Sequence, residues 1–249
     1  MSGTATRHPG EVRLFGFHHA GGSSSLFQAW RRLLPDGWEL QALDAPGHGT
    51  LMGRRPIDDL DGLLAFFLET VRPEPEVPYA FFGHSMGGIV AYELTRRLVA
   101  EGRVPPVWLG VSACRAPGTP LTLRRHTLGD EELRRHVAEL GGTPRQLLDD
   151  PGLWGIFGPL IRADLRLVET WESTAGPPLR VPLSVYGGHD DASVPPRQLA
   201  AWTERSAAFL GTRLFDGGHF YFSDDPRPLL THVVRDVRTA VESAGQRVG

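Results

Sequence analysis

Short β-rich runs alternate with helical patterns along most of the chain, and this alternation constrains the fold more than any other feature. Strands are predicted at residues 12–17, 38–43, 79–83, 107–113, 183–188 and 212–216. Helical signals lie between most of them, such as three serines able to cap residues 26–34 and apolar residues that recur at Val90, Leu94 and Leu98. Strands that alternate with helices form a parallel sheet covered by helices. The sequence therefore predicts an α/β fold, built on a mostly parallel sheet with flanking helices.

The connection between the fourth and fifth runs, residues 115–181, is too long for a simple crossover. It contains two helical patterns, at residues 130–140 and 151–172, and no strand pattern. Connections of this length usually have a function, and ligands of open α/β sheets bind at the carboxyl ends of the strands. We therefore predict one domain, residues 1–249, with residues 115–181 inserted as a helical lid. Extra helices packed on the flank of the sheet are the alternative.

Two absences from the composition narrow the chemistry. All 26 residues counted as Lys or Arg are arginines, which excludes mechanisms that need a phosphate-loop, Schiff-base or kinase-type lysine. The single cysteine, Cys114, excludes an intrachain disulfide and a multi-thiolate metal site. We expect Cys114 to be core packing, because no elbow motif surrounds it. The net charge of -3 offers no basic footprint for nucleic acid.

The sequence contains no segment with the pattern of a targeting or membrane segment. The first residues, MSGTATRHPGEV, lack the apolar core of a signal peptide. No run approaches the roughly 20 apolar residues that a membrane span needs. We therefore expect a soluble, cytoplasmic protein that does not associate with membranes.

Residues 81–90, FFGHSMGGIV, place Gly83, Ser85 and Gly87 in the pattern G-x-S-x-G between a predicted strand and a predicted helix. This is the context of a nucleophile elbow, a tight turn that holds a serine at its apex. Glycine is needed on both sides because the strand and helix backbones approach closely there. The free N–H groups at the start of the helix would then face whatever Ser85 attacks. An ordinary glycine-rich turn with an inert serine is the alternative.

A nucleophilic serine needs a histidine base and an acid that orients it, and candidates for both follow Ser85 at predicted strand ends. Asp190 and Asp191 come after the fifth run, and His219 comes after the sixth. The chain order Ser, Asp, His is that of the α/β-hydrolase fold. Each residue alone is common in turns and caps, but the joint placement favours a catalytic triad. His84, inside the elbow, is expected to be structural.

The oxyanion that forms when a serine attacks a carbonyl needs two backbone donors. The first is the N–H of Met86, the residue after the serine, and the second comes from the loop after the first strand. That loop, residues 18–24, reads HHAGGSS, and Ala20 is our candidate donor. A simple glycine turn is the alternative for this loop.

Six segments together resemble the discrete type II thioesterases that accompany polyketide synthases and nonribosomal peptide synthetases. They read FHHAGGSSSLFQAW, GHSMGGIVAYEL, LGDEELRRHVAELGGTP, IRADLRLVETW, GGHDDASVPP and GGHF. The resemblance implies an α/β-hydrolase fold that hydrolyses acyl thioesters held on the phosphopantetheine arm of a carrier protein, releasing stalled or wrongly primed groups. It implies a triad of Ser85, Asp191 and His219, with Ala20 and Met86 as oxyanion donors. It implies no metal and no bound cofactor.

The chain departs from the family's pattern at three positions. His18 stands where the family has Pro, His48 replaces the Arg of its P-G-R-G, and His189 replaces the first Asp of its Gly-Asp-x-Asp. These changes bear on loop rigidity and on local charge. The family's acid stands three positions before a valine, here Val194, which selects Asp191 from the two adjacent aspartates.

Other functions share parts of this pattern. A small-molecule carboxylesterase would have the same triad, and an acyl-transferring or cyclising release enzyme would exclude water from the acyl-enzyme. A non-catalytic binding module of the same fold would be expected to have lost a triad residue. Hydrolysis of acyl-carrier thioesters, compared with simple oxygen esters, separates the first of these from the thioesterase.

Two further features bear on substrate and partner. Four apolar residues at three- and four-residue spacing either form helix core or line an acyl channel: Trp154, Phe157, Leu160 and Ile161. Arginine pairs at residues 31–32, 124–125 and 134–135 are either solvated surface or a docking rim for an acidic carrier protein.

Overall fold

Six parallel strands form the sheet that the alternation predicts. Their bounds are β1 Val12–Phe17, β2 Trp38–Leu43, β3 Tyr79–His84, β4 Trp108–Ser112, β5 Leu183–Gly188 and β6 Phe209–Phe215. The strand order is β2-β1-β3-β4-β5-β6, and every neighbouring pair is parallel. This computed structural model describes residues 11–74, 76–121, 123–173 and 176–246. The predicted sheet is confirmed, although β6 begins before the expected residue 212, across a pairing irregularity opposite Leu183 and Ser184.

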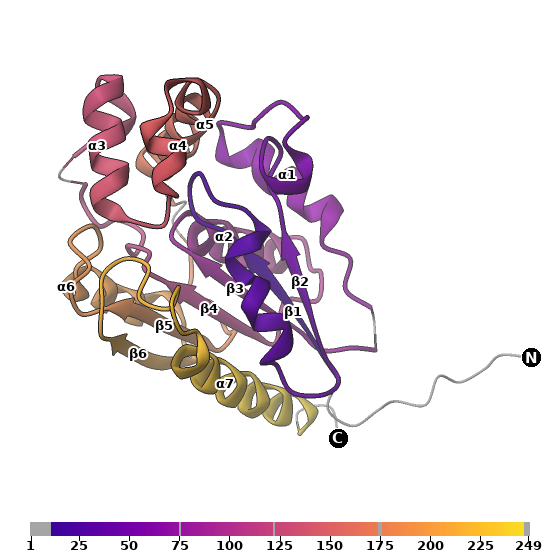
Figure 1. Cartoon of the computed structure of the whole chain (residues 1–249). Helices are drawn as coiled ribbons and strands as arrows, with labels where there is room; N and C mark the ends of the chain where they lie inside the picture. The colour runs from indigo at the N-terminus through magenta and orange to yellow at the C-terminus, as the bar shows by residue number, and fades with distance from the viewer. Residues whose placement is uncertain (1–10, 75, 122, 174–175, 247–249) are drawn as a thin grey trace, which may run out of the picture.

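Helices cover both faces of the sheet (Figure 1). On one face lie α1 Leu60–Thr70, α2 Met86–Ala100 and the short α6 Pro196–Leu199. On the other face lie α7 Arg227–Gly245 and a 3₁₀ helix, η1 Ser24–Arg32. The start of α1 shows why the chain turns helical there, because the Asp59 carboxylate accepts a hydrogen bond from the Gly62 N–H at 2.8 Å.

Side chains of the central strands alternate between these two layers. Phe15 and Phe81 pack with α1 and α2, whereas Leu14, Phe82 and Trp108 pack with η1 and α7. All five are fully buried. Strands covered on both faces carry apolar residues at consecutive positions, which is why these runs read as continuous apolar stretches in the sequence.

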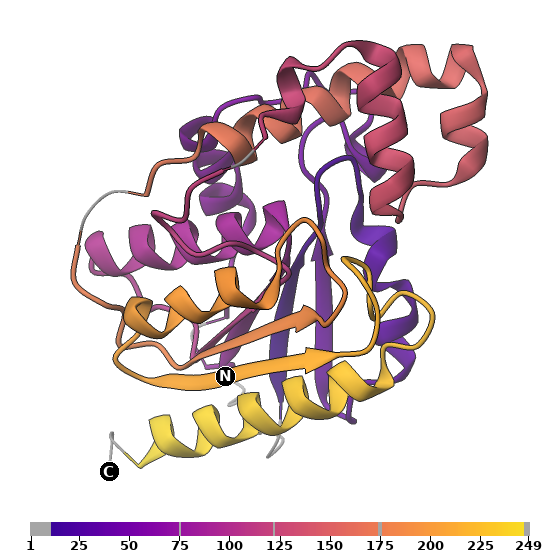
Figure 2. The same cartoon turned by 90° about the vertical axis from the view of Figure 1, so that its left-hand side faces the viewer.

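The described part of the connection between β4 and β5 contains three α-helices, α3 Asp130–Leu140, α4 Arg145–Asp149 and α5 Pro151–Thr170. They lie at one end of the molecule, opposite α7 (Figure 2). Asp150 caps α5 by accepting hydrogen bonds from the N–H groups of Gly152 and Leu153 at 2.7 and 3.0 Å. The patterns at residues 130–140 and 151–172 correspond to α3 and α5, and the short α4 lacked a pattern of its own. A lid role for these helices stays a prediction.

The described residues include no helix whose length and apolar character would let it cross a lipid bilayer.

Candidate active site

The turn between β3 and α2 holds Ser85 in a strained backbone conformation, with φ of 56° and ψ of -115°. A Cβ atom at Gly83 would clash with the carbonyl oxygen of Gly87, and one at Gly87 would clash with that of Phe17. Glycine is therefore the only residue type that fits at both positions. The Ser85 N–H donates to the Ser112 carbonyl at 2.8 Å, which ties the apex of the turn to the end of β4.

Asp191 and His219 form a buried hydrogen-bonded pair at the ends of β5 and β6. His219 Nδ1 lies 2.7 Å from Asp191 Oδ2, and Asp191 Oδ1 accepts from the N–H groups of Ser193 and Val194 at 2.8 and 3.0 Å. Burial raises the pKa of Asp191, but these hydrogen bonds outweigh burial and the pKa is lowered. An ionised Asp191 keeps the proton of His219 on Nδ1 and leaves Nε2 as an acceptor. Asp190 is exposed.

Ser85 and His219 open onto the same cavity, which lies between the strand ends and the helices α3 and α5. Ala20, the candidate oxyanion donor, also lines it. Apolar side chains make up much of the wall, among them Ile89, Val137, Leu140, Ile161, Leu165 and Phe220. A mostly apolar cavity that also contains polar groups suits a ligand with an acyl chain.

The second candidate oxyanion donor, Met86, is the first residue of α2. Backbone N–H groups in the first turn of a helix have no intrahelical acceptor, so this donor is free for a ligand. Asp44 ties the loop that carries Ala20 to the loop after β2. Its carboxylate accepts a hydrogen bond from the Ser24 N–H at 2.6 Å and one from the Thr50 N–H at 2.9 Å. Ala20 thus lines the cavity and Met86 directly follows Ser85 in the chain, and their role as oxyanion donors stays a prediction.

Only one of the four apolar residues considered for an acyl channel lines this cavity. That residue is Ile161, and Leu165 and Val168 continue the same face of α5. Trp154 belongs to a cluster between the inserted helices, and Leu160 lies against the loop after β2. Phe157 is half-buried and away from the cavity. Trp154 and Leu160 fit the helix-core alternative, because α5 is buried on more than one side and carries more than one apolar face. A channel role for Ile161 stays a prediction.

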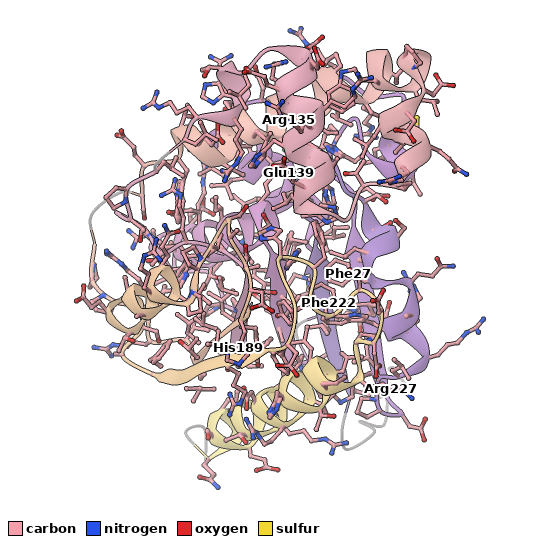
Figure 3. The ribbon with its side chains drawn as sticks, turned by 60° about the vertical axis from the view of Figure 1, so that its left-hand side comes forward. Phe27, Arg135, Glu139, His189, Phe222 and Arg227 are labelled. Carbon is pink, nitrogen blue, oxygen red and sulfur yellow. The ribbon has the colours of Figure 1, made fainter. Side chains whose placement is uncertain are left out.

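Two of the three histidines at departures from the family's pattern are built into the loops around the site. His18 is buried, accepts from the Ala45 N–H at Nε2 (3.2 Å) and donates from Nδ1 to the His19 carbonyl (2.7 Å). Burial and the neighbouring His48 lower the pKa of His18 to about 4. Hydrogen bonds thus hold this loop where the family has a proline. His189 is exposed and lies at the end of β5 (Figure 3).

Cys114 and His84 are buried near the elbow without being placed to react. Cys114 packs in the main core as predicted, and burial raises the pKa of its thiol to about 12. His84 is fully buried, with Nδ1 2.9 Å from the Ser112 hydroxyl. Burial, followed by the charge of neighbouring histidines, keeps the pKa of His84 well below its usual value.

Sequence reasoning missed a group of polar residues in the wall of the cavity. Arg125 lines the cavity and contacts His136. Of the pair at residues 124–125, Arg124 is therefore the residue exposed on the surface. The buried Glu169 of α5 accepts from the N–H groups of Arg125 and His126 at 2.9 and 3.0 Å. The sequence offered one clue to this group, because Glu169 stands four residues after Leu165, on the same buried face of α5.

The strand order, the elbow and the cavity at the strand ends define an α/β-hydrolase. Residues 12–241 match the family described as Thioesterase domain, and the chain therefore belongs to that family.

Known relatives agree with this assignment in sequence and in structure. GrsT, a gramicidin S biosynthesis protein of Aneurinibacillus migulanus, is 29% identical over 229 residues, covering 92% of this chain and 90% of the relative. Thioesterase PikA5 of Streptomyces venezuelae is 30% identical over 214 residues, covering 86% and 76%. The solved structure of the type II thioesterase BorB from the borrelidin biosynthetic cluster matches with a TM-score of 0.82 and 33% identity, covering 92% and 94%. YbtT, a type II thioesterase of a yersiniabactin pathway, matches with a TM-score of 0.85 and 29% identity, covering 94% and 96%.

Proposed function

We propose that this protein is a serine thioesterase that hydrolyses acyl thioesters from the phosphopantetheine arm of carrier proteins, removing stalled or aberrant acyl groups from a polyketide or nonribosomal peptide synthase. One observation carries the proposal: a buried Asp191–His219 pair opens with Ser85 onto an apolar cavity, in a chain of the thioesterase domain family. The relatives BorB and YbtT, named as type II thioesterases, support the class of substrate.

The first half of the reaction acylates the enzyme. His219 Nε2 takes the proton of the Ser85 hydroxyl as its oxygen attacks the thioester carbonyl carbon, and Asp191 stabilises the resulting imidazolium. The N–H groups of Ala20 and Met86 donate to the tetrahedral oxyanion. When the intermediate collapses, the carbon–sulfur bond breaks and His219 returns the proton to the sulfur. A thiol of pKa about 8.5 leaves more readily than an alkoxide, so the site need not be as demanding as that of an amidase.

The second half releases the acyl group. Water enters the cavity, loses a proton to His219 and attacks the acyl carbonyl carbon, and the same two backbone donors stabilise the second oxyanion. Breaking the ester bond returns the proton to the Ser85 oxygen. The products are a carboxylic acid and a carrier protein with a free thiol.

Exposed arginines near the inserted helices are the proposed docking surface for the carrier. Arg124 and Arg135 are exposed, and Arg135 lies on α3, at the end of the molecule away from α7 (Figure 3). Carrier proteins are generally acidic, and charge complementarity steers association more than it deepens affinity. Arg125 is left out of this surface because it faces the cavity.

We expect kcat/KM for an acylated carrier protein to exceed that for the matching short thioester mimic, and to fall with added salt as the screening length drops below about 10 Å. Charge reversal at Arg124 and Arg135 should lower kcat/KM for the carrier by roughly tenfold, because exposed charges act on the association rate. The mimic should be unaffected. Charge reversal at Arg238, exposed on α7, is the matched control. Equal efficiency on carrier and mimic, without a salt effect, would instead describe a general thioesterase.

The cavity face of α5 should set the preference for acyl length. We expect Leu165→Ala to raise kcat/KM for long relative to short acyl chains by about 10-fold or more, because one or a few methylenes in an apolar pocket are worth that much. Phe157→Ala, on the same helix but away from the cavity, is the control and should leave this ratio unchanged. An equal loss for every acyl length that tracks a lower melting temperature would assign Leu165 to the core alone.

A further inference from the structure

A buried carboxylate on α5 joins the inserted helices to the loop that carries Ala20. Asp164 Oδ2 accepts from the N–H of Gly21 at 2.6 Å. The same oxygen lies 2.8 Å from Nε2 of His48, which follows β2. The side chains of His48 and Asp164 are only 2% and 3% exposed. A single carboxylate oxygen therefore holds three segments that are far apart in the sequence.

The hydrogen-bond partners of His48 determine its protonation state. Nε2 faces the Asp164 carboxylate and Nδ1 lies 3.1 Å from the Pro46 carbonyl. Both partners only accept hydrogen bonds, so both bonds exist only when His48 is the doubly protonated imidazolium. His18, whose ring centre lies 4.8 Å away, is the opposite case, because one of its nitrogens accepts from a backbone N–H and the ring is neutral.

The helix also presses on the loop next to this hydrogen bond. Ile161 stands one turn before Asp164, and its side chain lies 2.6 Å from where a Cβ of Gly21 would be. Gly21 has φ of +72°, a conformation that glycine adopts without strain. The loop is therefore contacted by α5 at two points on the residue directly after Ala20, and the peptide plane between Ala20 and Gly21 is fixed by them.

We propose that His48 and Asp164 form a proton-dependent clamp that seats the oxyanion loop against α5, with Asp164 as a positioning residue for thioester hydrolysis. Its kinetic part rests on the function proposed above. The clamp fixes the Ala20–Gly21 peptide, and so limits how far Ala20 can turn its own N–H, on the preceding peptide, away from the oxyanion. This alignment matters in the transition state more than in substrate binding. Loss of the clamp lowers kcat and leaves KM nearly unchanged.

The charged and titratable groups that act on His48 come from two segments. They are Asp164 on α5 and His18 and His19 on the loop after β1. Asp44, just after β2, acts on the neighbouring His18. Burial and neighbouring histidines hold the pKa values of His18 and His19 low. Asp44 accepts hydrogen bonds from the adjacent loops, which keep its pKa low against the effect of burial. Asp164 is thus the direct ionic partner of His48.

The direction in which the clamp depends on pH follows from the interaction between His48 and Asp164. Burial lowers the pKa of His48, but the hydrogen bond and charge of Asp164 outweigh burial and raise the pKa above 6.5. The imidazolium, and with it the clamp, is therefore fully present below about 6.5 and is lost as the pH rises through the pKa in the folded protein. Activity should therefore fall on the alkaline side, as His48 loses its proton and the clamp opens.

Kinetic pH profiles of two variants test the clamp. In His48→Gln the amide can still donate to Asp164, but it carries no charge, so the weaker clamp should lower kcat by between about 10- and 100-fold. The amide does not titrate, so the fall in kcat at alkaline pH should disappear. In Asp164→Asn the side-chain oxygen can still accept from the Gly21 N–H, but the negative charge that favours the His48 imidazolium is gone. The fall in kcat at alkaline pH should therefore move to lower pH. Arg166→Gln, which breaks an exposed 3.4 Å ion pair from the same helix to Asp58, should keep the wild-type profile. An unchanged alkaline limb in His48→Gln would overturn the proposal.

A measurement that needs no turnover separates this proposal from the proposed function. In the intact protein, ¹⁵N shifts of the His48 ring should report an imidazolium at pH 6, and the amide proton shift of Gly21 should follow the titration of His48 as the pH rises. In Asp164→Asn both titrations should move together to lower pH. A neutral His48, or a Gly21 amide that ignores it, would overturn the clamp even in an active enzyme. The expected titration in a protein that hydrolyses no thioester would overturn the thioesterase function and leave the clamp supported.

Discussion

Ser85→Ala is expected to lower the turnover of acyl thioesters by on the order of 10⁶, the scale found when the nucleophile of a serine hydrolase is removed. Ser85 is the one group in the cavity that combines a hydroxyl with the strained elbow and the start of α2. Without it, the Asp191–His219 pair has no serine hydroxyl to activate, and no acyl-enzyme can form. Release of free thiol from an acylated carrier protein measures the effect, after subtraction of spontaneous hydrolysis.

Two controls define what this result means. The melting temperature of Ser85→Ala should match that of the wild type, because the backbone of the elbow is set by Gly83 and Gly87 and not by the serine side chain. Cys114 lies in the wall of the same cavity, and Cys114→Ala should leave turnover within about tenfold of wild type, because the raised pKa keeps the thiol protonated. Near-normal hydrolysis by Ser85→Ala, or collapse of activity in a folded Cys114→Ala, would mean that the nucleophile is misassigned.

The strands were readable from the sequence because their pattern is local. β1, β2 and β5 begin and end at the residues predicted from their β-rich runs. The start of β6 was not readable, because Gly211, at φ of 119°, and the pairing irregularity beside it interrupt the pattern. The segment after Ser23 read as helical but forms a 3₁₀ helix, η1, since a serine cap favours either helix and packing against the sheet decides.

The elbow and the order of Ser85, Asp191 and His219 were also local information, since each follows a strand. Asp164 was not, because its partners lie 116 and 143 residues away in the sequence. An acid three residues after Ile161 on a buried helix face was the available hint, but no local pattern says which loop it meets. Contacts of this kind depend on how an insertion packs on the sheet, and that is set by tertiary structure.

The sequence also does not show how a helix is rotated about its own axis. Trp154, Leu160 and Ile161 are all apolar and buried, yet only Ile161 faces the cavity. The arginine pair at residues 124–125 shows the same limit, because Arg124 is exposed and Arg125 lines the cavity. Spacing identifies a buried face, but it does not tell which neighbour that face meets.

Asp191→Asn is expected to lower turnover by roughly 10⁴, whereas Asp190→Asn should be mild. The amide of the variant can donate to His219 Nδ1, which then carries no proton and leaves the proton on Nε2, where the general base must accept. Asp190 is exposed and its side chain has no place in the site, so it is the matched control one residue away. Turnover of an acylated carrier protein measures both variants, and the reverse ranking would mean that Asp190 is the acid.

Stability gives an independent reading of the same residue. The pKa of Asp191 is lowered in the folded protein because the His219 and backbone hydrogen bonds outweigh burial, so its carboxylate stabilises the fold above its unfolded pKa of about 3.9. That contribution is lost as the pH falls through the folded pKa. We therefore expect Asp191→Asn to unfold more easily than the wild type at neutral pH, and the difference to shrink in acid. A difference that does not depend on pH would show that the charge of Asp191 is not what the site uses, and the expected loss of turnover would then need another cause.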